Sequence, residues 1–167
     1  MNFRNPVRTG IPKLSISREA VQKKRSTSAP DLSRIDLSRG IGDQARMYLN
    51  SSTQRGIPVS MITATEGESA FTVQDWSQFL HLSEDTLRRY EKLKKIFGPM
   101  QSDRILQILM LDKRGIEVFG EAQRFSNWVR TNIPALGGAR PFDLIESSFG
   151  ISLLMDELGR IEHGIFA

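Results

Sequence analysis

Residues able to carry out acid–base or nucleophilic chemistry are sparse in this chain of 167 residues. It contains no cysteine, and its two histidines, His81 and His163, lie far apart in the sequence. This composition excludes disulfides and thiolate sites and argues against a histidine-rich metal site. Serines never fall in a GxSxG turn, and the glycine-rich motifs that bind nucleotide phosphates are absent. We therefore predict no catalytic residue, no metal and no cofactor, and a protein that is not an enzyme.

DNA binding is the second chemistry to consider, and its candidate residues lie between positions 72 and 95. Two predicted helices, the second beginning at Ser83, are joined by a turn of about three residues, as in a helix-turn-helix. Arginine can bond guanine in the major groove, and both basic side chains neutralise phosphate. The candidate DNA-binding residues are Ser83, Thr86, Arg88, Arg89 and Lys92. An ordinary helical hairpin with a solvated charged face is the alternative, and it is favoured by Glu84 and Asp85, which would repel phosphates.

Basic residues are concentrated at the start of the chain. Residues 1–55 hold eleven Lys and Arg against four acids, whereas residues 56–167 hold twelve against fifteen. A basic segment attached to a slightly acidic body indicates a polyanionic or acidic partner, or simply a solvated arm. Because residues 1–42 contain few large apolar side chains, we predict that they form a flexible arm.

The C-terminal part combines charged and aromatic residues of the types that are enriched at protein interfaces. Arg140, Arg160 and His163 lie in a segment that also contains Trp128, Phe142, Phe149 and Phe166. The alternative is that the aromatic residues form the core of a small helical unit and the arginines are solvated. Ile165 and Phe166 fit that alternative less well, because they follow Gly164, where the last predicted helix ends.

The elements that would position these residues are all helical. Thr72 is a predicted N-cap with Asp75 as its capping-box partner, and Ser83 begins a helix that extends to about Ile96. The apolar stripe of that second helix would be Leu87, Tyr90, Leu93 and Phe97. Residues 101–119 are apolar nearly all round, so this helix should be central and buried. Gly115 inside it indicates close packing.

Shorter helices are predicted after Gly120 and at Pro141, and a longer one from Ser148 or Gly150 to Gly164. Its apolar stripe would be Ile151, Leu154, Met155, Leu158 and Ile161, with Asp156 and Glu157 on the exposed side. The glycines at 137–138 indicate a close backbone turn. The predicted architecture is therefore all-α: an arm at 1–42, a helix-turn-helix or dimerisation region at 43–98, and a small helical unit at 99–167.

Two C-terminal segments, NIPALGGARPFDLI and LGRIEHGIFA, give the chain a family likeness. They resemble the toxin-binding region of Xre/MbcA/ParS-type antitoxins. The matching positions are Asn132, Leu136, Gly137, Gly138 and Pro141, then Leu158, Ile161, Gly164 and Ala167. Upstream, LSEDTLRRYEK resembles the Xre-like helix-turn-helix of that family, through Ser83, Thr86, Leu87 and Arg89.

This resemblance implies an antitoxin of a type II toxin–antitoxin pair, in the cytoplasm and without a membrane partner. The implied partner is a RES-domain toxin that attacks NAD or uses it to modify a target, so NAD would be the partner's substrate. The antitoxin would cover the toxin's active site and, as a homodimer, repress its own operon. The expected toxin-binding residues are Arg140, Arg160, His163, Ile165 and Phe166. The alternatives are a stand-alone helix-turn-helix regulator whose C-terminal unit only dimerises, and a binding subunit that has lost DNA binding.

Overall fold

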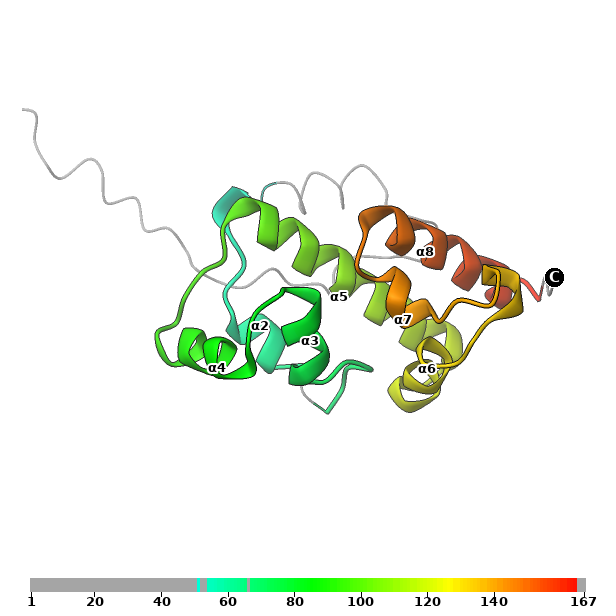
Figure 1. Ribbon diagram of the computed structural model, residues 1–167, viewed down its shortest axis with the longest axis horizontal. Helices are drawn as coiled ribbons and strands as arrows, with labels where there is room; N and C mark the ends of the chain where they lie inside the picture. Colours follow the sequence, from blue (N-terminus) through cyan, green and yellow to red (C-terminus); the bar gives the residue numbers. More distant parts are fainter. Residues whose placement is uncertain (1–50, 52–53, 66, 165–167) are drawn as a thin grey trace, which may run out of the picture.

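The computed structural model describes residues 51, 54–65 and 67–164, and this part of the chain is helical, as predicted (Figure 1). Its elements are α2 (Ser60–Thr63), α3 (Val73–Phe79), α4 (Glu84–Lys92), α5 (Pro99–Phe119), α6 (Ala122–Val129), the 3-10 turn η3 (Pro134–Leu136), α7 (Pro141–Leu144) and α8 (Ser148–Glu162). The β-structure of the described residues is one isolated antiparallel bridge between Pro58 and Ile96. The predicted arm at 1–42 lies outside the described residues.

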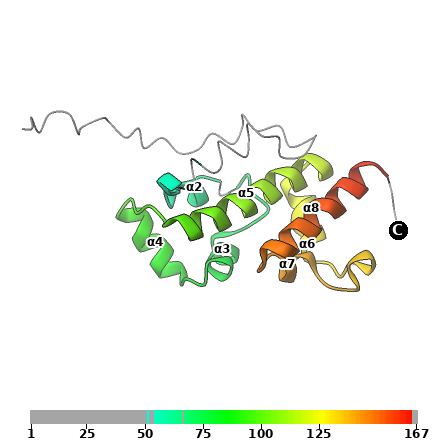
Figure 2. The ribbon, with the colours of Figure 1, turned by 90° about the horizontal axis from the view of Figure 1, so that it is seen from above.

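Helix α5 is the long element against which the others pack. With 21 residues it is about 31 Å long, at 1.5 Å per residue. In both views it runs from the end that carries α4 to the end that carries α6 and α8 (Figures 1 and 2). Ile105, Ile108 and Leu111 are fully buried along it. This burial confirms the prediction that the helix is central.

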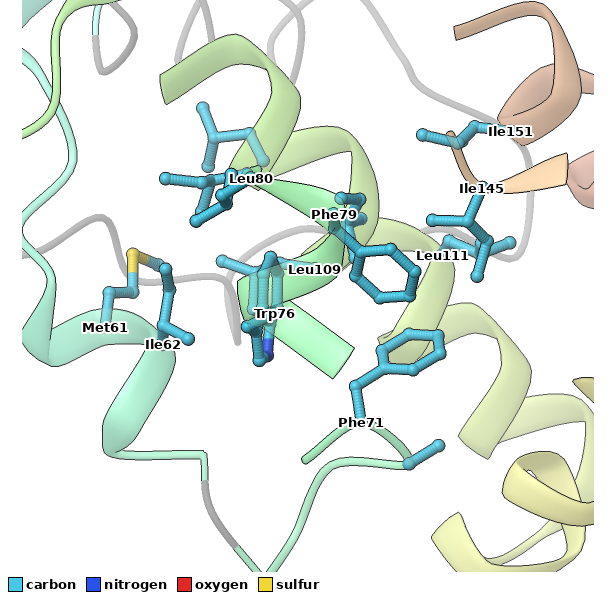
Figure 3. Close-up of a cluster of buried hydrophobic side chains, with 14 of the residues drawn as sticks. Met61, Ile62, Phe71, Trp76, Phe79, Leu80, Leu109, Leu111, Ile145 and Ile151 are labelled. Atoms are coloured by element: carbon cyan, nitrogen blue, oxygen red, sulfur yellow. The ribbon is translucent and has the colours of Figure 1, made fainter. Parts of the chain in front are cut away.

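One hydrophobic core joins the helix-turn-helix segment to the C-terminal helices (Figure 3). The ring of Phe71, just before α3, lies 6.0 Å from the ring of Phe125 in α6. The ring of Phe79 in α3 lies 5.1 Å from that of Phe142 in α7. Because these contacts cross the predicted boundary at residues 98 and 99, the two regions do not have separate cores. The boundary itself stays a prediction.

The helix starts follow from local hydrogen bonding. The Thr72 hydroxyl accepts from the backbone N–H of Asp75 at 3.2 Å, and the Asp75 carboxylate accepts from the N–H of Thr72 at 2.8 Å. These two bonds complete the predicted capping box. Ser83 caps α4 in the same way through the N–H of Thr86, also as predicted. Pro99 occupies the first turn of α5, where its missing N–H costs no hydrogen bond.

The end of α4 differs from the prediction, because the helix stops at Lys92 and not near Ile96. Lys94 has a φ of 49°, and the following residues pair with the chain before α2. The N–H of Val59 donates to the carbonyl of Lys95 at 3.1 Å, and the N–H of Phe97 donates to the carbonyl of Ile57 at 2.9 Å. Leu93 is consequently 69% exposed and does not join the apolar stripe.

The last helix begins at Ser148, one of the two predicted starts, with Ser147 as its N-cap, and a second correction concerns one of its acidic residues. Asp156 is exposed as predicted, but Glu157 is buried. Glu157 lies three residues after Leu154 and next to Leu158, so it shares the face that packs on the core. Its carboxylate is satisfied by Arg160 at 3.2 Å from the same helix. Met155 and Ile161, at the edges of the apolar stripe, are half-buried.

Gly115 in α5 packs closely against a side chain of α6, which confirms the close packing that its position in the sequence predicted. A Cβ atom added there would lie 2.3 Å from the ring of Phe125. This ring cannot move aside, because Phe125 is fully buried by its neighbours. Replacing Gly115 by alanine should therefore destabilise the fold by about 1 to 2 kcal/mol, after the gain in helix propensity is deducted. Gly159→Ala is the matched control, because nothing lies within 4 Å of its added Cβ. Urea unfolding of the two variants should shift the midpoint in opposite directions, and a stabilised Gly115→Ala would contradict the close packing.

Candidate functional surfaces

The turn between α3 and α4 holds the second helix in a fixed orientation. His81 adopts a φ of 52°, a conformation more often taken by glycine or asparagine. The N–H of Leu82 then donates back to the carbonyl of Ser77 at 2.9 Å. On the other side of α4, the Thr63 hydroxyl donates to the carboxylate of Glu91 at 2.5 Å. Together with the buried Leu87, these contacts fasten α4 to α2 and α3.

The five predicted DNA-binding residues are not equally available in this arrangement. The hydroxyls of Ser83 and Thr86 bond each other at 2.8 Å and cap the helix, so both serve the local fold. Arg88 forms an exposed ion pair with Glu84 at 3.8 Å. Arg89 and Lys92 are exposed and form no ion pair with any residue that the structure describes. The cationic groups free to meet a phosphate on α4 are therefore those of Arg89 and Lys92.

Two further lysines extend the positive charge beyond the end of α4. Lys94 and Lys95 are exposed, and the Lys95 ammonium lies 3.8 Å from the centroid of the Tyr90 ring. The hydrogen bond and the charge of Lys95 lower the pKa of Tyr90. We call Arg88, Arg89, Lys92, Lys94 and Lys95 the basic edge. Neither Lys94 nor Lys95 belongs to the predicted set of DNA-binding residues.

An ion pair that the sequence did not indicate links the two halves of the chain. The guanidinium of Arg130, after α6, donates to the carboxylate of Asp75 at 2.7 Å, the same carboxylate that completes the capping box of α3. Arg130 also lies over the ring of Phe142 in α7, 5.5 Å from its centroid. The side chain therefore connects the first helix of the helix-turn-helix to the segment around Pro141.

The loop between α6 and α7 closes on itself through backbone hydrogen bonds. The N–H of Ile133 donates to the carbonyl of Ala139 at 3.1 Å, and the N–H of Gly138 donates to the carbonyl of Ile133 at 3.0 Å. Gly137 and Gly138 have φ values of 70° and 80°, which confirms the predicted glycine turn. Both glycines are exposed, so the loop offers backbone with little side-chain cover.

Arg140, the first predicted toxin-binding residue, follows this loop and is exposed. It donates two hydrogen bonds to Asp143, at 2.9 and 2.8 Å, and this partner raises the pKa of the guanidinium. Arg160 and His163 are exposed near the end of α8. No hydrogen bond or ion pair joins Arg140 to these two among the described residues. Ile165 and Phe166 lie outside the part of the chain that the structure describes.

The last turn of α8 is anchored to α5 by a buried cation. The side chain of Arg114 is only 7% exposed and forms a bidentate ion pair with Glu162. Its Nη1 donates to Oε1 at 3.1 Å, and its Nη2 donates to Oε2. A buried guanidinium requires such a partner, since its desolvation is otherwise uncompensated. The pair fixes the helix end from which the predicted toxin-binding tip continues. Sequence reasoning did not identify Arg114, because it follows a long apolar run.

Two family models match the parts of the chain that carry these surfaces. A family model described as the antitoxin Xre-like helix-turn-helix domain matches residues 49–110. A second model, described as the antitoxin Xre/MbcA/ParS C-terminal toxin-binding domain, matches residues 114–164. The chain belongs to the Xre/MbcA/ParS antitoxin family. The two matches meet within α5, so both domains of this antitoxin use the same central helix. The basic edge lies in the first match, and Arg140, Arg160 and His163 lie in the second.

Individual relatives agree with the family models. The chain is 25% identical over 135 residues to an "Antitoxin Xre" of Photorhabdus laumondii, covering 75% of this chain and 86% of that one. It is 32% identical over 72 residues to an "Antitoxin Xre" of Yersinia enterocolitica, covering 42% and 49%. It is 27% identical over 145 residues to a "Prs ADP-ribosylating antitoxin" of a Sphingobium species, covering 86% and 77%.

Membership in this family makes the chain a helix-turn-helix antitoxin and a non-enzymatic regulatory protein, as predicted. Within residues 51, 54–65 and 67–164, no three His, Asp or Glu side chains are grouped to hold a metal ion. The same residues contain no helix that is long and apolar enough to cross a membrane.

The ion pair between Arg114 and Glu162 should make stability depend on pH in a defined direction. The Arg114 hydrogen bond and charge hold the pKa of Glu162 below its ordinary value of 4.5. A lowered folded-state pKa contributes stability at neutral pH that is lost as the pH falls below that ordinary value. Glu162→Gln should therefore be less stable than the wild type at pH 7, and the difference should shrink towards pH 3.

Thermal unfolding followed by circular dichroism between pH 7 and pH 3 measures this difference. The matched control is Glu121→Gln, whose ion pair with Arg124 is exposed and should contribute little at any pH. A Glu162→Gln variant that keeps a constant stability deficit across this range would contradict the role given to the ion pair.

Proposed function

We propose that this antitoxin inhibits a RES-domain toxin by covering its active site with the C-terminal end, and represses its own operon through α4. The observation that carries the proposal is the separation of two exposed surfaces along α5. The basic edge lies at one end of α5 and the exposed end of α8 lies at the other (Figures 1 and 2). With about 31 Å of helix between them, DNA and toxin need not compete for the same surface.

For DNA, the proposed contact residues are Ser83, Thr86, Arg88, Arg89 and Lys92. The capping hydroxyls would set the position of the helix start, and the free cations of Arg89 and Lys92 would contact phosphate or guanine. A homodimer would place two copies of α4 in successive major grooves of a palindromic operator. The proposed division of the chain is the one the sequence predicted, with the helix-turn-helix region at 43–98 and the toxin-binding region at 99–167.

For the toxin, the proposed contacts are Arg140, Arg160, His163, Ile165 and Phe166. Support comes from the match to a toxin-binding domain over residues 114–164 and from the exposure of the described members of this set. The name of the Sphingobium relative refers to ADP-ribosylation, a reaction that consumes NAD, and this supports an NAD-using partner. NAD would then be a substrate of the toxin, and the pair would act in the cytoplasm.

Removing residues 165–167 tests the role of the tip. The deletion leaves α8 and the ion pair between Arg114 and Glu162 intact, whereas truncation after Leu158 would also strip the buried Arg114 of its partner. Co-purified toxin and its NAD consumption are the measurements. We expect the shortened chain to inhibit NAD loss at least tenfold less well than the full chain, with unchanged helical content. Full inhibition by the shortened chain would exclude the tip from the contact.

The same co-expression distinguishes the proposed function from its main alternative. If the neighbouring gene product never co-purifies while the full-length chain forms a dimer that binds its own promoter fragment, the chain is a stand-alone regulator whose C-terminal unit only dimerises.

Salt dependence tests the basic edge. Each phosphate contact contributes about one unit to the slope of log affinity against log salt concentration. Replacing both Arg89 and Lys92 by glutamine should weaken binding to the chain's own promoter fragment and reduce that slope by about two. Arg124→Gln, an exposed cation on α6 at the other end of the molecule, is the control and should leave the slope unchanged. An unaltered slope in the double variant would remove α4 from the DNA contact.

A further inference from the structure

Phe149 is unusual among the aromatic residues that the structure describes, because its side chain is 81% exposed. Each of the other phenylalanines that the structure describes packs against another aromatic ring, and Phe149 does not. The possibility that the C-terminal aromatic residues all belong to the core is therefore wrong for Phe149. An exposed aromatic side chain becomes a candidate contact when other residues of interface type lie beside it on the same face.

The position of Phe149 on α8 relates it to two of the proposed toxin contacts. Residues 149, 153, 156, 160 and 163 are three or four positions apart and so lie on one side of the helix. We call this side the outer face of α8. It is formed by Phe149, the half-buried Leu153, and the exposed Asp156, Arg160 and His163. The opposite side carries Ile151, Leu154 and Leu158, which are buried against the core.

The backbone around Phe149 is held firmly. A Cβ atom added at the next residue, Gly150, would lie 1.9 Å from the carbonyl oxygen of Leu144, so the first turn of α8 is pressed against the end of α7. The N–H of Gly150 also donates to the N-cap hydroxyl of Ser147 at 2.9 Å. A side chain on so well-ordered a backbone loses little conformational entropy when a partner covers it. Rigid aromatic residues of this kind commonly dominate binding energy at protein interfaces.

We propose that the whole outer face of α8 is a docking surface for the toxin, with Phe149 as its aromatic anchor. This inference rests on the proposed function and extends the contact away from the chain end. The toxin is the occupant because the matched toxin-binding domain, residues 114–164, contains all of α8. The face also runs without interruption from Phe149 to Arg160 and His163, over about 21 Å of helix. The fitting partner surface has an apolar pocket for Phe149 and an acidic patch for Arg160 about 16 Å away.

Phe149→Ser tests this surface in the full-length chain. The probe is the toxin encoded by the neighbouring gene, purified as a catalytically inactive variant, and the measurement is its affinity by calorimetry. We expect Phe149→Ser to weaken binding about thirtyfold, the size typical of a truncated aromatic hot spot. Leu93→Ser is the matched control, since Leu93 is 69% exposed just after α4 and should leave the affinity unchanged. Circular dichroism of both variants should match the wild type, because neither side chain is buried.

Four outcomes of these measurements support or overturn the proposed docking surface. A thirtyfold loss confined to Phe149→Ser supports the surface. Wild-type affinity in Phe149→Ser, together with weakened binding by Arg140→Ala, whose ion pair with Asp143 is exposed, overturns the surface and leaves the proposed function standing. A fall from dimer to monomer in the free Phe149→Ser variant, measured by light scattering, would assign the face to a second copy of the chain and overturn the proposal. Failure of the wild type to bind the toxin overturns both this inference and the proposed function.

Discussion

Burial of the apolar residues of α5 is the constraint on which the rest of the structure depends. Ile105, Ile108 and Leu111 are fully buried, while Asp103 and Glu117 on the same helix are exposed. A helix with so wide an apolar surface is stable in water only when other elements cover it. The segment from α2 to α4 and the helices α6 to α8 both cover it, and their contacts overlap along its length. The N–H of Ala70, before α3, donates to Asp112, and Arg104 donates to the carbonyl of Ile145, after α7. Neither set of short helices has enough apolar surface to form a core without it. The antitoxin is therefore one cooperative body in which two matched domains share a helix.

This shared helix explains why the elements could be predicted from sequence while several side chains could not. Capping residues act over one turn, so Thr72, Asp75 and Ser83 are recognisable locally, and the structure has them as predicted. Asp112 and Arg114 are different, because a charged residue within a helix is ordinarily assigned to solvent. Both are buried, and their partners are remote in sequence: Asp112 accepts from the N–H of Ala70 and Arg114 binds Glu162. Burial accordingly raises the pKa of Asp112.

The two errors at helix ends have related causes. Residues 93–97 continue a helical apolar pattern, but pairing of Lys95 and Phe97 with the chain before α2 satisfies backbone groups that the helix would have used. Glu157 looks like a solvated acid by type, and only its register with Leu154 and Leu158 places it inside. For the candidate surfaces, the residue types and their positions on a helix face could be predicted from the sequence. The pairing of Arg88 and the exposure of Phe149 could not be predicted, because both depend on how the side chains pack.

The contact of Arg130 with Asp75 bears on how antitoxins of this kind can diversify. The capping box of α3 belongs to the helix-turn-helix, yet the residue that neutralises its carboxylate comes from the other domain. A recombination event joining the first half of one antitoxin to the second half of another would leave Asp75 without its cation unless both sources had kept the pair. Exchange of whole halves between relatives would therefore reduce the stability of the fold wherever the pair was not kept. The exposed faces of α4 and α8 lie outside the shared core, so single substitutions there can alter a surface without disturbing the packing.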